Sequence, residues 1–323
     1  MKLRMYWKVP TKHSASGYTI DMIDAELPIR WATIKNELGH LRSVDGGFSQ
    51  ARRGLLALPD GTQVFVKLGM DENTKQWAKK EVAVYRFLQN NNYKYIPTLL
   101  SVNDDESAFA ITAHTPEDGW NWNEDWTEDR INKTLEAMDA LAALQPKGDD
   151  DRFFSEKAVT ENDDGWKILL DSPDLRATLI KKLHGVGRGA LADALDIAQE
   201  AKKSAQFVFR DDALVHNDVR ADNCAWNPSA KEVKLVDWNW AQRGDRRIDL
   251  AATLTHVQKS GFAVLPQYAS RLDGNALHWM AGFWFKAAAT PIWEGGPEHL
   301  RDIQLFSGLT AWDLSHDVRQ TFL

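Results

Sequence analysis

The sequence predicts an α+β fold, in which a strand-rich first third is followed by a mainly helical remainder. Two observations predict this class. The apolar runs of the first third are short and bounded by turn residues, whereas the apolar residues after about position 130 recur mostly at helical spacing. The polar segment 114–125 separates the two patterns. We therefore expect one domain over residues 1–113 and a second over residues 114–323.

The first domain is expected to contain an antiparallel sheet and one helix. Strand-like runs occupy residues 41–43, 51–58, 63–68 and 107–112. Pro59-Asp60-Gly61, between the second and third runs, is typical of a hairpin turn. From Thr74 the period changes, and a helical apolar face is formed by Trp77, Val84, Tyr85 and Leu88. Glu81 lies on that same face, where a lone carboxylate is costly unless a cation meets it.

The second domain is expected to be helical apart from one short strand and a hairpin. Helical patterns occupy residues 131–144, 175–183, 190–205, 250–258 and 275–289. The strand-like run 213–215 leads into the polar loop 216–223. A hairpin then follows, with strands at 224–226 and 233–236 and a turn at 227–229.

Composition excludes several classes of function. With 323 residues, 43% hydrophobic and 26% charged, the chain can bury a full core. A net charge of -7 argues against nucleic acid as a partner, and a cationic or neutral small molecule, such as a sugar, fits better. The N-terminus lacks the apolar core of a signal peptide, and the longest apolar stretch, 276–285, is too short to span a bilayer, so we expect no membrane partner. The single cysteine, Cys224, is expected to be a buried strand residue in a cytoplasmic protein.

The loop HNDVRADN, residues 216–223, carries the densest set of chemically active side chains. Because the hairpin that follows it is antiparallel, Asp237 at the hairpin's end should return towards Asn223. A carboxamide oxygen beside a carboxylate suits Mg²⁺, which also takes phosphate oxygens and water. Asp218 is then left to accept a proton from a substrate hydroxyl.

Three motifs occur in one order along this part of the chain. They are HND at 216–218 with Asn223 five residues after its Asp, LVDW at 235–238, and GDRRIDLA at 244–251. Together they resemble the aminoglycoside phosphotransferase and choline kinase-like family of small-molecule kinases. The resemblance implies a bilobal protein-kinase-like fold, with residues 1–113 as a nucleotide-binding N-lobe and 114–323 as a C-lobe with the catalytic loop, metal site and acceptor pocket. It also implies ATP and Mg²⁺ as cofactors.

The resemblance further implies which residues would bind the nucleotide. They are Gly46, Gly47, Ser49, Lys67, Glu81, Thr112 and His114. The two glycines and the serine would form a loop around the phosphates, and Lys67 would bind the phosphates while paired with Glu81. That pairing explains the carboxylate on the apolar helix face. The backbone of 112–114 would meet adenine.

In the second lobe the resemblance implies Asp218 and Arg220 as catalytic residues and Asn223 with Asp237 as metal ligands. Arg220 would neutralise charge on the transferring phosphoryl group. We expect His216 to brace the loop rather than to react. We expect Asp249 to hold the loop by accepting backbone hydrogen bonds and to cap the helix that follows it.

Two functions remain open from the sequence. The first is an ATP-dependent kinase that phosphorylates a hydroxyl of a small molecule such as an aminoglycoside, a sugar or an amino alcohol. The second is a regulatory pseudokinase that binds nucleotide without turnover. The acceptor is not identified, and neither is the choice of ATP over GTP. Aromatic and acidic side chains either line an acceptor pocket or fill the core; they include the segment 120–126, His278, Trp279, Trp284, Trp293, Glu294 and Asp313, and for Trp279 and Trp284 we favour the core.

Overall fold

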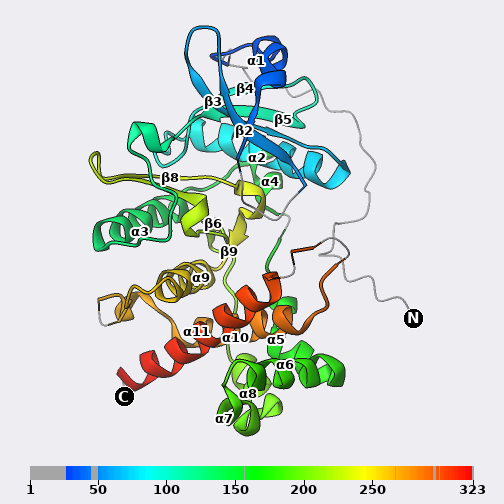
Figure 1. Cartoon of the computed structure of the whole chain (residues 1–323). Coiled ribbons are helices and arrows are strands. Elements are labelled where there is room, and N and C mark those ends of the chain that lie inside the picture. The colour runs from blue at the N-terminus through cyan, green and yellow to red at the C-terminus, as the bar shows by residue number, and fades with distance from the viewer. Residues whose placement is uncertain are drawn as a thin grey trace. The chain divides into compact units, whose positions relative to one another are not determined.

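The computed structural model describes residues 27–44, 50–155, 157–265, 267–293, 296–297 and 299–321 (Figure 1). The chain divides into two compact units. Unit 1 is formed by Met1–Val82 and Thr98–Ala113, and unit 2 by Ala83–Pro97 and His114–Leu323. One boundary therefore falls between Ala113 and His114, at the start of the polar segment. The chain also crosses at 82/83 and 97/98, because the second half of the helix that carries Glu81 belongs to unit 2.

Unit 1 is built on a five-stranded antiparallel sheet in the order β1-β2-β3-β5-β4. Its strands are β1 (Arg42–Ser43), β2 (Arg52–Ala57), β3 (Gln63–Leu68), β4 (Leu99–Val102) and β5 (Ala108–Thr112). The expected hairpin joins β2 to β3, with Leu55 opposite Phe65. The edge strand β4 was not predicted from the sequence, because it is only four residues long and lies between the Pro97 break and a turn.

The two faces of this sheet carry different residues because side chains alternate along a strand. Val64 and Val66 of β3 are buried with Ile34 of the helix α1 (Trp31–Glu37), which was not predicted. Lys67 points to the opposite face, where its side chain meets Glu81 of α2 (Glu72–Asn90). Figure 1 shows α2 running along the sheet. Helix α2 therefore supplies the partner that a buried strand lysine needs.

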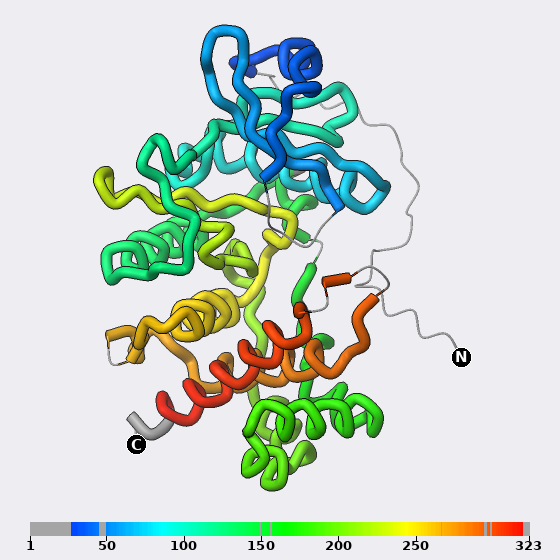
Figure 2. The backbone as a smooth tube through the Cα atoms, in the orientation of Figure 1, coloured from blue at the N-terminus to red at the C-terminus, as the bar shows by residue number. Residues whose placement is uncertain are grey.

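Unit 2 contains a small β region that carries the polar loop. Strand β6 (Ala213–Val215) pairs with β9 (Gln242–Gly244), and β7 (Cys224–Asn227) pairs with β8 (Glu232–Leu235). Helix α3 (Glu128–Ala142) packs against β6 and β8, and Figure 2 shows the β7-β8 hairpin beside it. The loop 216–223 thus leaves one two-stranded ladder and enters the other.

The other helices of unit 2 pack mostly around α10 or against its neighbours. They are α4 (Asp151–Ser155), α5 (Gly165–Asp171), α6 (Pro173–Gly185), α7 (Gly189–Ala194), α8 (Ile197–Ser204), α9 (Arg246–Lys259), α10 (Gly274–Ala289) and α11 (Leu300–Thr321). Short 3₁₀ helices are η1 (Leu38–His40), η2 (Pro116–Asp118), η3 (Gly148–Asp150), η4 (Glu161–Asp163), η5 (Ala221–Asn223), η6 (Trp238–Trp240) and η7 (Ala269–Arg271). Helix α10 contacts α5, α6, α9 and α11.

The expectation of one helix over residues 190–205 was wrong. Two helices, α7 and α8, occupy this stretch, and the chain is extended at Leu195 and Asp196 between them. The Asp196 carboxylate accepts the amide hydrogens of Ala198 and Gln199, at 3.0 and 3.1 Å. An N-cap aspartate of this kind starts a new helix even where the apolar pattern continues.

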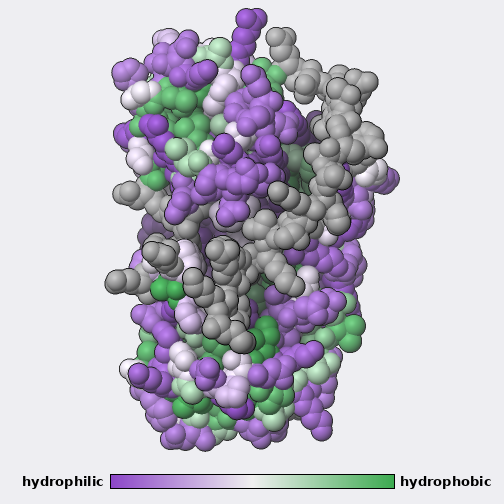
Figure 3. Space-filling view, turned by 90° about the vertical axis from the view of Figure 1, so that its right-hand side faces the viewer, coloured by the Kyte–Doolittle hydropathy of each residue, from purple (hydrophilic) through white to green (hydrophobic). Residues whose placement is uncertain are grey.

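The described surface is mostly hydrophilic on the face shown in Figure 3, with hydrophobic residues in separate patches. Among the residues with described burial, Val208 is the most exposed large hydrophobic side chain, at 74%. Among the residues that the structure describes, no helix has both the length and the apolar character needed to cross a membrane.

The packing of α5 against α10 leaves no room for a side chain at Gly165, so Gly165→Ala should destabilise the protein. A methyl group there would meet the backbone of Gly282 in α10, and overpacking of this kind costs about 1–3 kcal/mol. Gly185→Ala is the matched control, because nothing lies within 4 Å of a methyl group at that position. Urea unfolding of both variants checks this; equal midpoints would contradict the close approach.

Candidate active site

The loop 216–223 is held at its start by one carboxylate. Asp249, in the first turn of α9, accepts the amide hydrogens of His216 and Asn217, at 3.2 and 2.9 Å. Asn217 has a left-handed backbone, with φ 63°, and its side-chain amide donates to the carbonyl of Trp240. Burial raises the pKa of Asp249 to about 6, and the two amide hydrogen bonds oppose that rise. The loop and α9 are therefore one hydrogen-bonded structure.

One expectation about Asp249 was wrong. Helix α9 begins at Arg246, so Asp249 lies inside its first turn and does not cap it. The cap is Asp245, whose carboxylate accepts the amide hydrogen of Arg247 at 2.9 Å. Asp245 also accepts the amide hydrogen of Arg210. The two carboxylates therefore have different roles: Asp245 caps the start of the helix, and Asp249 holds the loop.

His216 joins this loop to the end of the hairpin. Its ring is fully buried; Nε2 donates to the carbonyl of Val236 at 3.0 Å, and Nδ1 accepts the amide hydrogen of Asp218 at 3.3 Å. Because a carbonyl only accepts and an amide only donates, the ring is neutral with its proton on Nε2. Burial lowers the pKa of His216 to about 4, which agrees with this neutral form. The ring thus links Asp218 to the residue just before Asp237.

Asp218 lies in a network of side chains from its own loop. The Asn223 amide nitrogen donates to both the carbonyl and the carboxylate of Asp218, each at 2.9 Å. Arg220 Nε lies 3.1 Å from the same carboxylate, and a second guanidinium nitrogen lies 3.0 Å from Asp222. Burial raises the pKa of Asp218 to about 7; the Arg220 charge opposes the rise, and the charges of Asp237 and Asp222 add to it. A carboxylate in this state can take up a proton near neutral pH.

Asp237 is placed by the hairpin register. Cys224 lies opposite Leu235, and the Val236 amide donates to the Asn223 carbonyl at 3.0 Å. Asp237 follows directly, with a left-handed backbone at φ 68° that is unusual for a residue other than glycine. The hairpin therefore brings Asp237 within one residue of the position opposite Asn223.

The donors of Asn223 and Asp237 suit a partial magnesium site. Within the part of the chain that the structure describes, no group of three or more His, Cys, Asp or Glu side chains could hold a metal ion. Since the Asn223 amide nitrogen is used by Asp218, its oxygen is the atom left for a cation. One amide oxygen and one carboxylate fit Mg²⁺ when phosphate oxygens and water complete its shell.

Lys67 and Glu81 form a buried ion pair within unit 1. Lys67 Nζ donates to Glu81 Oε1, and the side chains are 8% and 2% exposed. Removing one partner of such a pair leaves an uncompensated buried charge, which is strongly destabilising. The pair therefore fixes the position of the lysine ammonium group relative to β3 and α2.

Of the other residues expected to bind nucleotide, the structure describes Thr112 and His114 but not the three in the loop between β1 and β2. Gly46, Gly47 and Ser49 lie outside the described residues. Thr112 ends β5, and its amide donates to the Thr98 carbonyl at 2.9 Å. His114 begins the second stretch of unit 2, and its carbonyl accepts from Trp122 Nε1 at 2.8 Å. Burial lowers the pKa of His114 to about 4.

Arg130 of α3 was missed in the sequence analysis. Its side chain is fully buried, and its guanidinium donates to four backbone carbonyls, those of Asn123 (2.7 Å), Asp125 (3.3 Å), Ala221 (3.2 Å) and Cys224 (2.7 Å). It therefore ties the polar segment before α3 to the second half of the loop 216–223 and to the start of β7. The sequence feature that could have identified Arg130 is its position on the apolar face of the helix, one turn before the buried Thr134. Glu81 was recognised by the same feature.

The aromatic residues considered for an acceptor pocket mostly fill the core. Trp279 and Trp284 are buried, as favoured from the sequence, and His278 is stacked on Trp166 inside unit 2. Trp293 is 45% exposed, and Glu294 lies outside the described residues. In the segment 120–126, Trp120 and Trp126 are buried, and Asp313 near the C-terminus pairs with Arg188.

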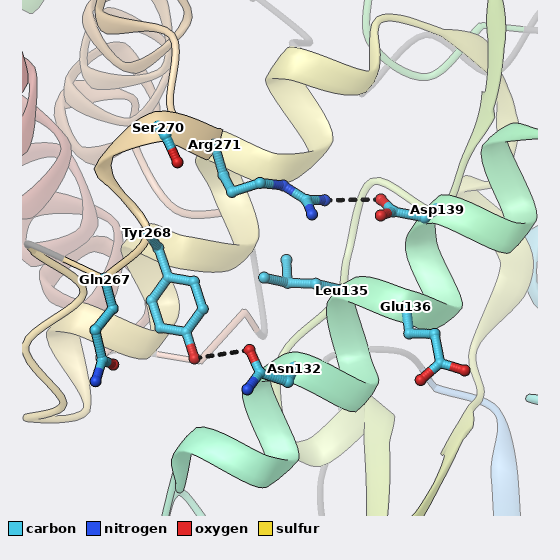
Figure 4. Close-up of a pocket in the computed structure, with 8 residues that line it drawn as sticks. All are labelled: Asn132, Leu135, Glu136, Asp139, Gln267, Tyr268, Ser270 and Arg271. Atoms are coloured by element: carbon cyan, nitrogen blue, oxygen red, sulfur yellow. Dashed lines mark hydrogen bonds and ion pairs between the residues drawn. The ribbon is translucent and has the colours of Figure 1, made fainter.

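A pocket of ≈ 400 Å³ lies between α3 and the segment before α10 (Figure 4). Its polar side chains bond to one another: Arg271 donates to Asp139 at 2.8 Å, and the Tyr268 hydroxyl donates to Asn132 at 3.0 Å. None of the site residues expected from the sequence is among the eight that line it. The pocket is therefore separate from the Asp218 network.

Comparison with known proteins decides the family. Residues 40–283 match the model of the phosphotransferase enzyme family. The chain belongs to this family. No curated protein sequence gave a significant match. The resemblance seen in the sequence is thus confirmed, and family membership supports a small-molecule phosphotransferase rather than a pseudokinase.

Solved structures share the fold at low sequence identity. Choline kinase LicA from Streptococcus pneumoniae is 12% identical with a TM-score of 0.54, over 89% of this chain and 99% of that one. A spectinomycin phosphotransferase in complex with ADP and spectinomycin is 12% identical, with a TM-score of 0.55, over 86% and 93%. An aminoglycoside phosphotransferase from Alicyclobacillus acidocaldarius is 15% identical, with a TM-score of 0.51, over 91% and 96%. The expected bilobal α+β, protein-kinase-like fold is confirmed.

The neutral, buried ring of His216 should make the phosphotransferase sensitive to acid. The folded-state pKa, about 4, lies below the ordinary value of about 6.5, so the unfolded chain binds the extra proton between these values and stability falls as pH falls. His216→Gln cannot titrate. Between pH 6.5 and 4, the wild type should lose about 2–3 kcal/mol more unfolding free energy than this variant. Urea titrations at several pH values check this; parallel curves for the two proteins would contradict it.

Proposed function

We propose that this phosphotransferase is an ATP-dependent kinase that transfers the γ-phosphate to a hydroxyl of a small molecule. The observation that carries the proposal is the network around Asp218, in which Asn223 bonds to the Asp218 carboxylate while the hairpin returns Asp237 beside Asn223. A structural role alone gives no reason to gather these groups in one short loop. The buried Lys67–Glu81 pair adds a phosphate-binding cation at a fixed place in unit 1.

The proposed reaction follows from the positions of these side chains. Asp218 accepts the proton of the acceptor hydroxyl while the oxygen of that hydroxyl forms a bond to the γ-phosphorus. The bond from that phosphorus to the β–γ bridging oxygen breaks, ADP leaves, and the proton passes from Asp218 to solvent. Lys67 holds the phosphates, and Arg220 keeps the Asp218 carboxylate in place while it offsets negative charge nearby. Mg²⁺ held by Asn223 and Asp237 would neutralise phosphate charge.

The adenine contacts in this proposal fall on the backbone of Thr112 to His114, and the phosphate contacts also include Gly46, Gly47 and Ser49. In this reading, residues 1–113 are the nucleotide-binding lobe and residues 114–323 the catalytic and acceptor-binding lobe. The spectinomycin phosphotransferase with ADP and spectinomycin supports a nucleotide and a small hydroxylated acceptor as the pair of substrates. The pseudokinase alternative leaves Lys67, Glu81, Asp218, Asn223 and Asp237 without a common purpose.

Asp218→Asn is the sharpest test of the proposed reaction. The variant cannot take the hydroxyl proton, so phosphotransfer should fall about 100-fold or more. The affinity for ATP should hardly change, because Asp218 would face the acceptor. The measurement is a screen of ATP-dependent phosphorylation over sugars, aminoglycosides, amino alcohols and hydroxy acids, followed by kinetics on the best acceptor. Near-normal turnover in the variant would reject the role of Asp218, and failure of the wild type over the whole panel, with intact ATP binding, would favour the pseudokinase.

The two metal ligands should differ in what their loss does. Asp237→Ala should remove phosphotransfer at any practical Mg²⁺ concentration, because a carboxylate ligand and its charge are both lost. Asn223→Ala should keep weak activity with a raised Mg²⁺ midpoint, because water can replace one neutral ligand. Titration of turnover and of nucleotide affinity with Mg²⁺ checks both. An Asp237→Ala protein with the wild-type midpoint and rate would contradict the metal site.

A further inference from the structure

The helix that holds the catalytic loop also presents two nitrogen-bearing side chains further along. Asp249 of α9 bonds to the loop, and His256 lies seven residues later on the same side of the helix, about 10 Å along its axis. Lys259 follows three residues after His256 and shares that side. Anchoring of the loop by Asp249 therefore fixes where His256 and Lys259 stand relative to Asp218.

Lys259 is a half-buried cation without a close counterion. Its Nζ donates to the Ser307 hydroxyl of α11 at 3.2 Å. Across the described ranges, no Asp or Glu oxygen lies within 4.0 Å of that nitrogen. Ser307 is buried and also donates to the Ile303 carbonyl, so it does not depend on the lysine. A partly desolvated ammonium group with one neutral partner is costly unless an anion comes to it.

His256 is half-buried beside this cation. Its ring meets the ring of Trp284 edge to face, with centroids 5.8 Å apart. In the region covered by the structure, its ring nitrogens make no hydrogen bond to protein. Burial lowers the pKa of His256 far below its ordinary value, and the charges of Lys259 and Arg220 lower it further. A neutral imidazole still has one N–H to donate to a ligand.

The catalytic loop lies close enough to both groups to act on them. Burial lowers the pKa of Lys259, and the positive charge of Arg220 adds to the effect, while the negative charges of Glu124 and Asp222 oppose it. Arg220 is two residues from Asp218 and is already bonded to Asp218 and Asp222. Glu124 is exposed. Within the described chain, Lys259 is thus a cation near the loop with no carboxylate at contact distance and with a single neutral hydroxyl partner.

We propose that His256 and Lys259 bind an anionic group of the acceptor, a carboxylate or a phosphate, while the acceptor's hydroxyl meets Asp218. The inference rests on the proposed kinase function and narrows its acceptor to a small hydroxylated anion. The ammonium group of Lys259 and the N–H of His256 would donate to the anion's oxygens, and Trp284 would shield one side of the site from water. An ammonium group on the acceptor would be repelled by Lys259, so amino alcohols and aminoglycosides fit this site poorly.

The test compares four probes that share a three-carbon diol and differ in charge. They are glycerate, glycerol 3-phosphate, glycerol and 3-amino-1,2-propanediol. Binding is measured by saturation-transfer NMR on the whole protein with Mg²⁺ and a non-hydrolysable ATP analogue, so that Lys67 and the metal site are occupied. The two anions should bind at least about 10-fold more tightly than the neutral and cationic probes. The tighter of the two anions identifies the carboxylate or the phosphate as the preferred group.

Variants show whether the difference arises at this site. Lys259→Met should weaken binding of both anions about 10-fold or more, His256→Asn should weaken it less, and Lys259→Arg should largely preserve it. Lys202→Met removes an exposed lysine from α8 and should change nothing. Thermal melts confirm that each variant is folded. Equal binding of glycerol and glycerate, full anion binding by Lys259→Met, or no binding of either anion would each overturn the inference.

The inference and the kinase function can fail separately. A protein that phosphorylates neutral or cationic acceptors, with rates unchanged by Lys259→Met, would keep the kinase function and lose the anion site. A protein that binds the anions through Lys259 but transfers phosphate to no acceptor in the panel would keep the anion site and lose the kinase function.

Discussion

The Asp249 carboxylate accepts two backbone hydrogen bonds, from the amides of His216 and Asn217. The arrangement of the candidate active site depends on this interaction. The amide of His216 is buried, and because the backbone turns at Asn217 in a left-handed conformation, this amide has no strand partner in the described chain. The Asp249 carboxylate accepts its hydrogen instead. With that turn fixed, His216 can direct its ring between Asp218 and Val236. Asp218, the proposed proton acceptor, and Val236, the residue before Asp237, are then tied through one imidazole.

The same physical rule explains the other buried charged residues. A charge inside a protein needs hydrogen-bonding partners, and those partners can be drawn from segments distant in sequence. Arg130 uses backbone carbonyls on two segments, and Lys67 uses Glu81 across β3 and α2. In each case a single desolvated group fixes two elements in a way that apolar packing, which is non-directional, does not.

A structural feature could be predicted from the sequence where it depends on residues that are close together in the chain. The β2-β3 and β7-β8 hairpins were predictable because Pro59-Asp60-Gly61 and Asn227-Pro228-Ser229 are turn sequences. Glu81 was predictable as a buried partner because it stands on an apolar helical face. Strand β4 was not, because it is only four residues long beside the Pro97 break, and the pairing of β6 with β9 was not, because these strands lie far apart in the chain. The break between α7 and α8 was missed because the Asp196 cap outweighs a continuing apolar pattern.

The candidate site divides in the same way. Asp218, Asn223 and Asp237 were recognisable because they fall at fixed sequence spacings around one hairpin. The capping role assigned to Asp249 was wrong because Asp245, four residues earlier, accepts from the first free amides of the helix.

In the proposed function, helix α9 connects catalysis to acceptor choice. Its first turn holds the loop through Asp249, and its third and fourth turns carry His256 and Lys259. Because a helix is stiff over this length, the loop and the proposed anion site cannot shift independently. A substitution that tilts α9, for example at its packing with α10 and α11, should therefore disturb acceptor binding and turnover together, whereas Lys259→Met changes binding alone. Under these proposals the protein keeps one catalytic geometry while the side chains further along α9 set which acceptor it takes.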